Sequence, residues 1–356
     1  MKYPRFLLLA LVFISACKTR SPQTVQLPPA GTAFEKLSEY GFFTGDLKEL
    51  KPNNGVLPYN MVNSVFTDYS LRKCFMYVPQ GAKLSFDSTQ LLSLPQGSCL
   101  INVIYYPNNP KTSSTEKHLI ETQLLLNGAD GWQAVTYLWN EDQTDALKTD
   151  IGDIKAIDWL NEKGSNMHAD FVVANKNQCK GCHWYGNHIT PIGVKAGNLN
   201  TTADYLASPK NQLTYWKESG LLADDYSSGI KYVNWRDTSN SLDDRTRAYL
   251  DANCAHCHNP KGPAYVSGLF LNYDNHNMET YGLCKSPPSA GKGSCNLRVD
   301  IVPGKPGESI IMCRVASTEL GVKMPQMGRT MVDIDGVALI AKWIMSLQGN
   351  CEVESN

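Results

Sequence analysis

Hydrophobic residues in the first half of the chain follow the pattern of β-strands. Four runs rich in Val, Ile, Leu and aromatic residues are separated by turns that contain Asn, Gly and Pro, such as 108–110 and 127–131. These runs are 73–78, 98–106, 119–126 and 132–139. We therefore predict a mostly β domain with a sandwich-like arrangement over residues 34–165.

The pattern changes after this domain. Gly, Pro and Asn become frequent, and short helical patches replace the strands. Ser241 can cap a helix whose first turn carries Asp243 and Asp244, because acids are favoured at the positive end of a helix. A last helix is predicted by apolar positions at helical spacing, which are Ile340, Trp343, Ile344 and Leu347. The sequence therefore predicts an α+β protein with further modules at 166–240 and 241–351.

The first residues have the order of charged and apolar positions found in export signals. Lys2 and Arg5 precede the apolar run 6–14. This run is shorter than the roughly 20 residues that a membrane-spanning helix needs. We therefore expect a secretory signal peptide rather than a spanning segment.

The end of this signal adds a second expectation. The sequence ISAC at 14–17 resembles the bacterial lipoprotein motif, which implies a lipid on Cys17 and removal of residues 1–16. An ordinary signal peptide with an accidental cysteine is the alternative. Residues 17–33 are polar and rich in proline, which suits a lipidated cysteine followed by a tether.

Composition narrows the class of protein. The 356 residues are 42% hydrophobic and carry a net charge of −1, so there is no basic excess and no nucleic acid partner is expected. Eleven cysteines are many for a cytosolic protein and natural in an oxidising compartment. Both observations agree with an exported globular chain.

Two Cys-x-x-Cys-His motifs stand out, at 179–183 and 254–258. Two thiols three positions apart lie on one face of a helical turn, so both can bond to one porphyrin while the next histidine binds its iron. A redox dithiol or half of a zinc site is the alternative for one such motif. Two matches in an exported chain favour two covalently bound haem c groups. The predicted covalent positions are Cys179, Cys182, Cys254 and Cys257, and the predicted iron ligands are His183 and His258.

A methionine is the predicted sixth ligand at the second motif. Met324 precedes a proline shortly before the last helix, where a loop can present its sulfur to the iron. A thioether favours ferrous iron and raises the potential relative to a second nitrogen ligand. Met327 and Met331 are the rival candidates.

The first motif is less complete, because no methionine lies between His183 and the second motif. His188 is the favoured sixth ligand, and His168, a side chain from another domain, or no ligand are the alternatives. The carbonyl of Pro191 could accept a hydrogen bond from His183 Nδ1 and set the basicity of the ligand.

Several segments resemble known cytochromes. The stretch from Asn253 through 267–269, 302–306, 324–325 and the final helix is similar to cytochrome c domains of the planctomycete type. The mature chain as a whole resembles a family of bacterial di-haem cytochrome c lipoproteins whose physiological role is not established. That wider resemblance is carried by YGFFTG at 40–45, YLWNEDQTDA at 137–146, NQCKGCH at 177–183, PIG at 191–193, NLN at 198–200 and RAYLDANCAHCHNP at 247–260. It implies haem binding and electron transfer, and family members are often encoded beside a parallel β-helix repeat protein.

The module at 241–351 is accordingly expected to be an all-α domain like class I cytochrome c. In such domains the first and last helices cross. We therefore expect Tyr249 of the first helix to contact Trp343 of the last.

The remaining cysteines suggest disulfides. Outside the two motifs and Cys17 the chain has an even number of them, as a disulfide framework needs. They are Cys74, Cys99, Cys284, Cys295, Cys313 and Cys351. Cys284 with Cys295 is the favoured pair, because the prolines and glycines between them suit one closed loop.

Together these patterns predict an electron carrier in the cell envelope that faces the periplasm. Its expected partners are redox proteins and, through the lipid, a membrane; a small-molecule substrate is not expected. Lys18 after the lipidated cysteine weakly favours the outer membrane, by resemblance to known sorting. The alternatives are a di-haem peroxidase-like enzyme with an open first haem, and a cytochrome docking subunit of a periplasmic dehydrogenase.

Overall fold

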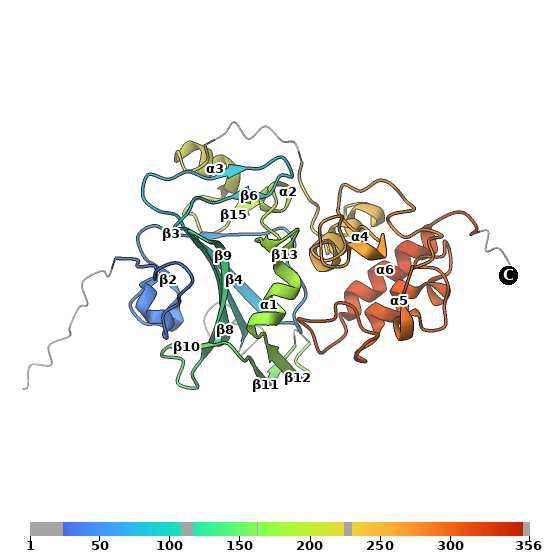
Figure 1. The fold of residues 1–356 in the computed structure, drawn as a ribbon, viewed down its shortest axis with the longest axis horizontal. Coiled ribbons are helices and arrows are strands. Elements are labelled where there is room, and N and C mark those ends of the chain that lie inside the picture. Colours follow the sequence, from blue (N-terminus) through green and yellow to red (C-terminus); the bar gives the residue numbers. More distant parts are fainter. Residues whose placement is uncertain (1–23, 108–116, 162, 224–229, 352–356) are drawn as a thin grey trace, which may run out of the picture.

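The computed structural model describes residues 24–107, 117–161, 163–223 and 230–351 (Figure 1). The N-terminal half is built around one antiparallel sheet and the C-terminal part is helical, so the chain is mixed α and β. The predicted lipidation site, Cys17, lies outside the described residues. Within them, no helix combines the length and the apolar composition that crossing a membrane requires.

The main sheet has six antiparallel strands in the order β10-β9-β8-β7-β4-β3. In chain order they are β3 (Val56–Tyr59), β4 (Leu71–Tyr77), β7 (Cys99–Pro107), β8 (Lys117–Gly128), β9 (Gly131–Trp139) and β10 (Ala146–Thr149). The four predicted runs coincide with β4, β7, β8 and β9, so the prediction of a mostly β N-terminal part is confirmed. Segments rich in β-branched and aromatic residues form strands here because both faces of the sheet are covered, so their apolar side chains are buried on either side.

Different segments cover the two faces. On one face, Tyr40 of the 3₁₀ turn η1 (Leu37–Tyr40) packs into the core and its hydroxyl lies 2.8 Å from that of Tyr137. On the other face, Trp216 packs in one cluster with Met76. The other sheets of the described chain have two strands each, so a single sheet between irregular layers replaces the expected sandwich of two large sheets. The residues after position 173 lack long alternating runs, which a second large sheet needs.

The shorter strands pair two by two. They are β1 (Phe43–Thr44) with β2 (Lys51–Pro52), β5 (Ser85–Phe86) with β6 (Leu92–Ser93), β11 (Asp153–Leu160) with β12 (Asn166–Val173), β13 (Trp184–Tyr185) with β14 (His188–Ile189), and β15 (Thr202–Ala203) with β16 (Lys210–Asn211). The β11–β12 hairpin packs against Ile104 and Tyr106 of β7. The boundary expected between residues 165 and 166 therefore falls inside a hairpin that belongs to the N-terminal part.

Helices follow the strands along the chain. The α-helices are α1 (Lys176–His183), α2 (Ala196–Leu199), α3 (Gln212–Glu218), α4 (Leu242–Leu250), α5 (Ile310–Ala316) and α6 (Ile334–Ser346). The other helical turns are η2 (Leu47–Glu49), η4 (Asp251–Ala255), η5 (Tyr265–Ser267), η6 (Gly291–Ser294) and η7 (Pro306–Glu308). In Figure 1, α1 lies beside the main sheet, whereas α4, α5 and α6 gather at the C-terminal end of the molecule.

Helix α4 is capped as the sequence predicts and crosses α6, but through other side chains than expected. Ser241 Oγ accepts a hydrogen bond from the Asp244 amide at 3.1 Å, which caps α4. The two helices cross where Gly336 leaves room for the ring of Tyr249. The ring of Trp343 packs instead against Tyr281, and both belong to the same buried cluster as Tyr249. A glycine in α6 therefore makes the close approach that was expected of Trp343.

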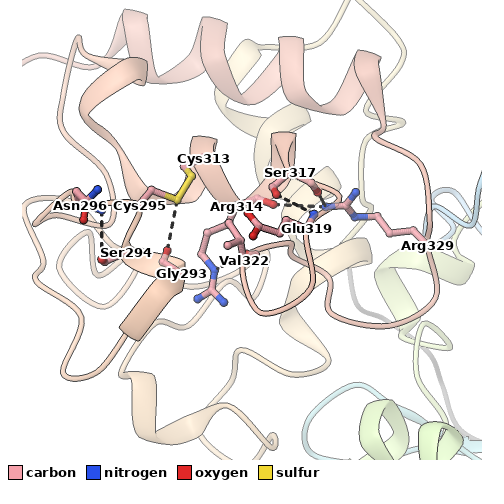
Figure 2. Close-up of a disulfide and its surroundings, with 10 residues drawn as sticks. All are labelled: Gly293, Ser294, Cys295, Asn296, Cys313, Arg314, Ser317, Glu319, Val322 and Arg329. Carbon is pink, nitrogen blue, oxygen red and sulfur yellow. Dashed lines mark hydrogen bonds between the residues drawn. A yellow bond between two sulfur atoms is a disulfide. The ribbon is translucent and has the colours of Figure 1, made fainter.

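Two disulfides close the C-terminal part, and they correct the predicted pairing. Cys284 is bonded to Cys351, and Cys295 is bonded to Cys313 of α5 (Figure 2). The favoured pair Cys284–Cys295 was wrong because α5 packs against η6 and brings its own cysteine to Cys295. Cys74 and Cys99 are buried and unpaired, so only four of the six candidate cysteines form disulfides among the described residues.

One buried carboxylate joins the N-terminal part to the loop before α6. Asp68 is 1% exposed and accepts hydrogen bonds from the amides of Thr330 and Met331, both at 2.8 Å, and from the Thr330 hydroxyl at 2.9 Å. The next residue, Tyr69, donates its hydroxyl to the Val332 carbonyl at 2.9 Å. Residues of the N-terminal part therefore hold the loop that carries the candidate methionine ligand.

Replacing Asp68 by alanine is expected to lower the free energy of unfolding by about 2–4 kcal/mol, because it leaves buried donors without an acceptor. Urea unfolding followed by circular dichroism measures this change. Asp130→Ala, in the exposed turn between β8 and β9, is the control and should change the same quantity by less than about 0.5 kcal/mol. Equally small effects of both substitutions would contradict this role of Asp68.

Candidate haem-binding sites

The first motif lies on the short helix α1, which begins at a well-formed cap. The Asn175 side chain accepts hydrogen bonds from the amides of Asn177 and Gln178 at 3.0 and 2.9 Å. One turn of this helix carries Cys179 and Cys182 on the same face, as the spacing predicts. Local capping therefore presents both thiols together.

These two cysteines open onto a large cavity. Its volume is about 760 Å³, and Cys179, Cys182 and His183 are among its lining residues. The Cys179 sulfur also lies 3.8 Å from the hydroxyl of Thr136 on β9, and residues of the main sheet such as Asn102 and Leu125 line the cavity, so the sheet forms one of its walls. A cavity of this size is within the range that cofactor sites occupy, about 300–1,000 Å³.

His183 has the protonation state and orientation that an iron ligand needs. Its Nδ1 lies 2.9 Å from the carbonyl oxygen of Thr190, and because a carbonyl only accepts, Nδ1 must carry the proton. Burial lowers the pKa of His183, so the imidazole is neutral and Nε2 keeps a free lone pair. The sequence predicted that the Pro191 carbonyl would accept this hydrogen bond, but the acceptor is the carbonyl of the preceding residue, Thr190.

Polar atoms without partners face the same cavity. Among the described residues, Glu121 Oε2 and Thr190 Oγ1 are buried without a hydrogen-bond partner, and both residues line the cavity. Arg72 lines it as well and supplies a positive charge. Two thiols, a neutral imidazole and a cation around a large hollow fit a porphyrin with acidic substituents, so these residues can hold a haem c.

The second motif begins in an irregular helical turn. Cys254 lies in η4, a π-type turn that continues directly from α4, and Cys257 and His258 follow it. Such turns are frequently found at functional sites. His258 Nδ1 lies 3.3 Å from the hydroxyl of Ser267, and burial lowers the pKa of His258 to about 4. This histidine is therefore also neutral and able to bind iron.

Met324 lies in a loop that one arginine organises. The guanidinium of Arg329 is 3% exposed and donates to the Met324 carbonyl at 2.7 Å and to the Ser317 carbonyl at 2.8 Å. Figure 2 shows this side chain reaching from its own loop toward Ser317. The Met324 amide in turn donates to the Arg314 carbonyl at 2.9 Å, so the backbone on which the candidate sulfur ligand stands is fixed.

The two rival methionines have other surroundings. Met327 packs so closely against Gly181 of the first motif that a side chain at that position would clash with it. Met331 packs with Ile104 and other buried residues of the main sheet. Met324 therefore stays the candidate ligand for the second haem, and Met327 is a contact between the C-terminal loop and the first motif.

The histidines proposed as sixth ligands of the first haem lie elsewhere. His188 lines a second cavity, with Nδ1 3.1 Å from Asn187 Oδ1. His168 is half exposed on β12 and its Nδ1 lies 2.8 Å from an Asp158 carboxylate oxygen. Neither is among the residues that line the cavity beside His183. Met61 of the N-terminal part does line that cavity, and it is a specific case of the side chain from another domain that the sequence analysis left open.

The two motifs meet in space. The sulfur of Cys257 lies 3.8 Å from the carbonyl oxygen of Gly181, although these residues are 76 positions apart. Next to this contact, the Gly186 amide donates to the Lys261 carbonyl at 2.9 Å. The fold therefore brings together two motifs that the sequence could only name separately.

The first candidate site also contains two residues that the sequence analysis missed. Arg72 and Glu121 lie on strands β4 and β8, more than 50 residues before Cys179. Nothing in their local sequence marks them, because a polar residue in a strand usually faces solvent. Only the register of the sheet places them beside the first motif.

Groups of three or more His, Cys, Asp or Glu side chains arranged to hold a metal ion do not occur in the part of the chain that the structure describes. Comparisons with protein-family models, with curated proteins and with solved structures found no match to this chain.

Proposed function

We propose that this chain is an exported di-haem c-type cytochrome that transfers electrons between redox partner proteins outside the cytoplasm. It would bind two covalent haem c groups, one at each Cys-x-x-Cys-His motif, and reach the membrane through a lipid on Cys17. No small-molecule substrate is needed for this role. The periplasmic side of the cell envelope is the proposed location.

The contact between the two motifs is the observation that carries the proposal. A haem at each motif would be attached to segments that touch at Gly181 and Cys257. Electron transfer between cofactors needs them close, fixed and insulated, and the protein supplies that placement.

Each proposed residue has a defined task. The four motif cysteines would hold the haems by thioether bonds, while His183 and His258 would bind iron in their neutral form. The sulfur of Met324 would favour ferrous iron at the second site. The buried Arg329 would keep that loop in one conformation through its bonds to backbone carbonyls.

A peroxidase-like enzyme is the second candidate, and one observation favours it. A cavity beside His183 is lined by a carboxyl group, Glu121, and by a cation, Arg72. A reductase of hydrogen peroxide needs a proton-transfer group and a positive charge near an open iron. The same cavity thus suits either a carrier or this enzyme.

Redox titration together with a peroxide assay separates the two. A carrier should give two one-electron waves, low-spin spectra for both ferric haems, and no peroxide turnover above that of a Cys179→Ala, Cys182→Ala variant. Fast peroxide reduction by the wild type, with a high-spin ferric haem that this double variant lacks, would overturn the carrier and support the enzyme.

A further inference from the structure

A row of polar side chains crosses the buried face of the main sheet that faces α1. The strands are in register so that one residue from each of five neighbouring strands falls in this row. Its members are Tyr59, Cys74, Asn102, Gln123 and Thr136. In the next row, Arg72 of β4 and Glu121 of β8 are both paired with Ile104 of β7. Buried polar groups are nearly always hydrogen-bonded, so a polar band inside an otherwise apolar sheet face needs hydrogen-bond partners.

Hydrogen bonds along this band end at Glu121. The Asn102 side-chain amide donates to Gln123 Oε1 at 3.0 Å, and the Gln123 amide donates to Glu121 Oε1 at 2.7 Å. Glu121 is 1% exposed, and in the described chain its second oxygen, Oε2, is buried without a hydrogen-bond partner. A buried carboxyl oxygen left in this state is costly if the group is charged.

Arg72 does not neutralise this carboxyl through a direct bond. Its Nη2 donates to the Val65 carbonyl at 3.1 Å and to the Thr67 hydroxyl at 2.8 Å. Arg72 and Glu121 nevertheless line the same cavity as Cys179 and His183. The carboxyl group is therefore placed beside the first motif. One of its oxygens accepts the Gln123 amide, and Oε2 has no hydrogen bond of normal geometry, although the Ala174 amide lies near the carboxyl group.

We propose that Glu121 takes up one proton when the first haem site gains one electron. The inference rests on the proposed function. The electron comes from an external one-electron donor, the proton comes from water, and the O–H bond forms on Glu121 Oε2. The negative charge that arrives with the electron is balanced by the proton, so the buried site keeps its net charge.

The surroundings of Glu121 set the pH range in which it takes up a proton on reduction. Burial raises the pKa of Glu121 to about 8, while the Gln123 amide, the Arg72 charge and the Ala174 amide favour the carboxylate and limit that rise. Cys179 of α1 is the other titratable group that faces it, and it would be a neutral thioether once bonded to haem. An added electron nearby raises the pKa of Glu121 further.

Glu121 thus has one pKa in the oxidised protein and a higher pKa in the reduced protein, and these two values set how the haem potential depends on pH. Below the pKa of the oxidised protein, Glu121 is protonated in both redox states and the potential of the first haem does not depend on pH. Between the two constants, only the reduced state holds the proton, so each tenfold fall in proton concentration makes reduction tenfold less favourable. For a one-electron couple this corresponds to about 59 mV per pH unit.

Potentiometric titration of the haem-loaded protein between pH 5 and 10 tests this. In the wild type, the potential of one haem should fall with rising pH over part of this range, and this part of the curve is called the falling segment. Glu121→Gln should remove the falling segment while leaving both haems bound and low-spin. Glu141→Gln, at an exposed turn, is the matched control and should behave as the wild type. A redox-induced infrared difference spectrum should also show a protonated carboxyl band that appears on reduction and is lost only in Glu121→Gln.

Two outcomes overturn the inference. One is an unchanged pH dependence in Glu121→Gln, and the other is an infrared spectrum without a band from this residue. If Glu121→Gln fails to fold, Gln123→Leu serves instead, because loss of its amide should move the falling segment to higher pH. An unmoved segment would equally reject the inference. A protein without covalent haem would instead reject the proposed function.

Discussion

Replacing both Cys179 and Cys182 by alanine is expected to halve the haem content of the protein, from two covalent groups to one. The substitution removes both thiols from the helical turn of α1 that faces the cavity, so no covalent bond to haem can form there. The second motif keeps its own cysteines in η4 and after it, and should still be loaded. Haem that survives acid and organic extraction is the quantity to measure.

The matched control for this experiment removes a cysteine that lies outside the motifs and outside the cavity. Cys99 is buried and unpaired and does not line that cavity, so Cys99→Ala should leave two covalent haems in the folded protein. An unchanged haem content in the Cys179→Ala, Cys182→Ala variant would contradict the assignment of the first site.

Replacing Met324 by histidine is expected to lower the potential of the second haem by on the order of 0.1–0.2 V. Nitrogen stabilises ferric iron better than a thioether does, and axial ligands and their surroundings together move haem potentials across roughly 0.8 V. The haem should stay low-spin, and the weak near-infrared absorption of ferric histidine–methionine haem should vanish. Redox titration and near-infrared spectroscopy measure both effects.

The first haem should barely shift in this variant, because its proposed ligands lie on another segment. Met345→His is the control, since that side chain is 55% exposed on α6 and should change neither potential. If Met324→His leaves both potentials and the near-infrared band intact, Met327 or Met331 becomes the better candidate. The packing of Met327 against Gly181 would then have to rearrange.

Local patterns predicted the strands and caps well. The runs that became β4, β7, β8 and β9 were visible because hydrophobic and β-branched residues dominate them. Ser241 was recognised as a cap because a side-chain oxygen before acidic residues satisfies free amides at a helix start. Such features depend on a few neighbouring residues, and the sequence contains all of them.

Features that depend on residues far apart were missed or misjudged. The pairing of Cys295 with Cys313 follows from the packing of α5 on η6, which spacing along the chain does not reveal. The position of Glu121 beside the first motif follows from the register of β7 with β8. His188 was the favoured sixth ligand of the first haem, yet the β13–β14 hairpin places it at a different cavity from His183.

The intact mass of the mature protein, produced in cells that carry the cytochrome c maturation machinery, tests the central claim most directly. We expect the mass of the polypeptide increased by two haem groups, with both still bound after denaturation. A polypeptide that carries no haem, or zinc at these cysteines in its place, would contradict the proposed di-haem cytochrome.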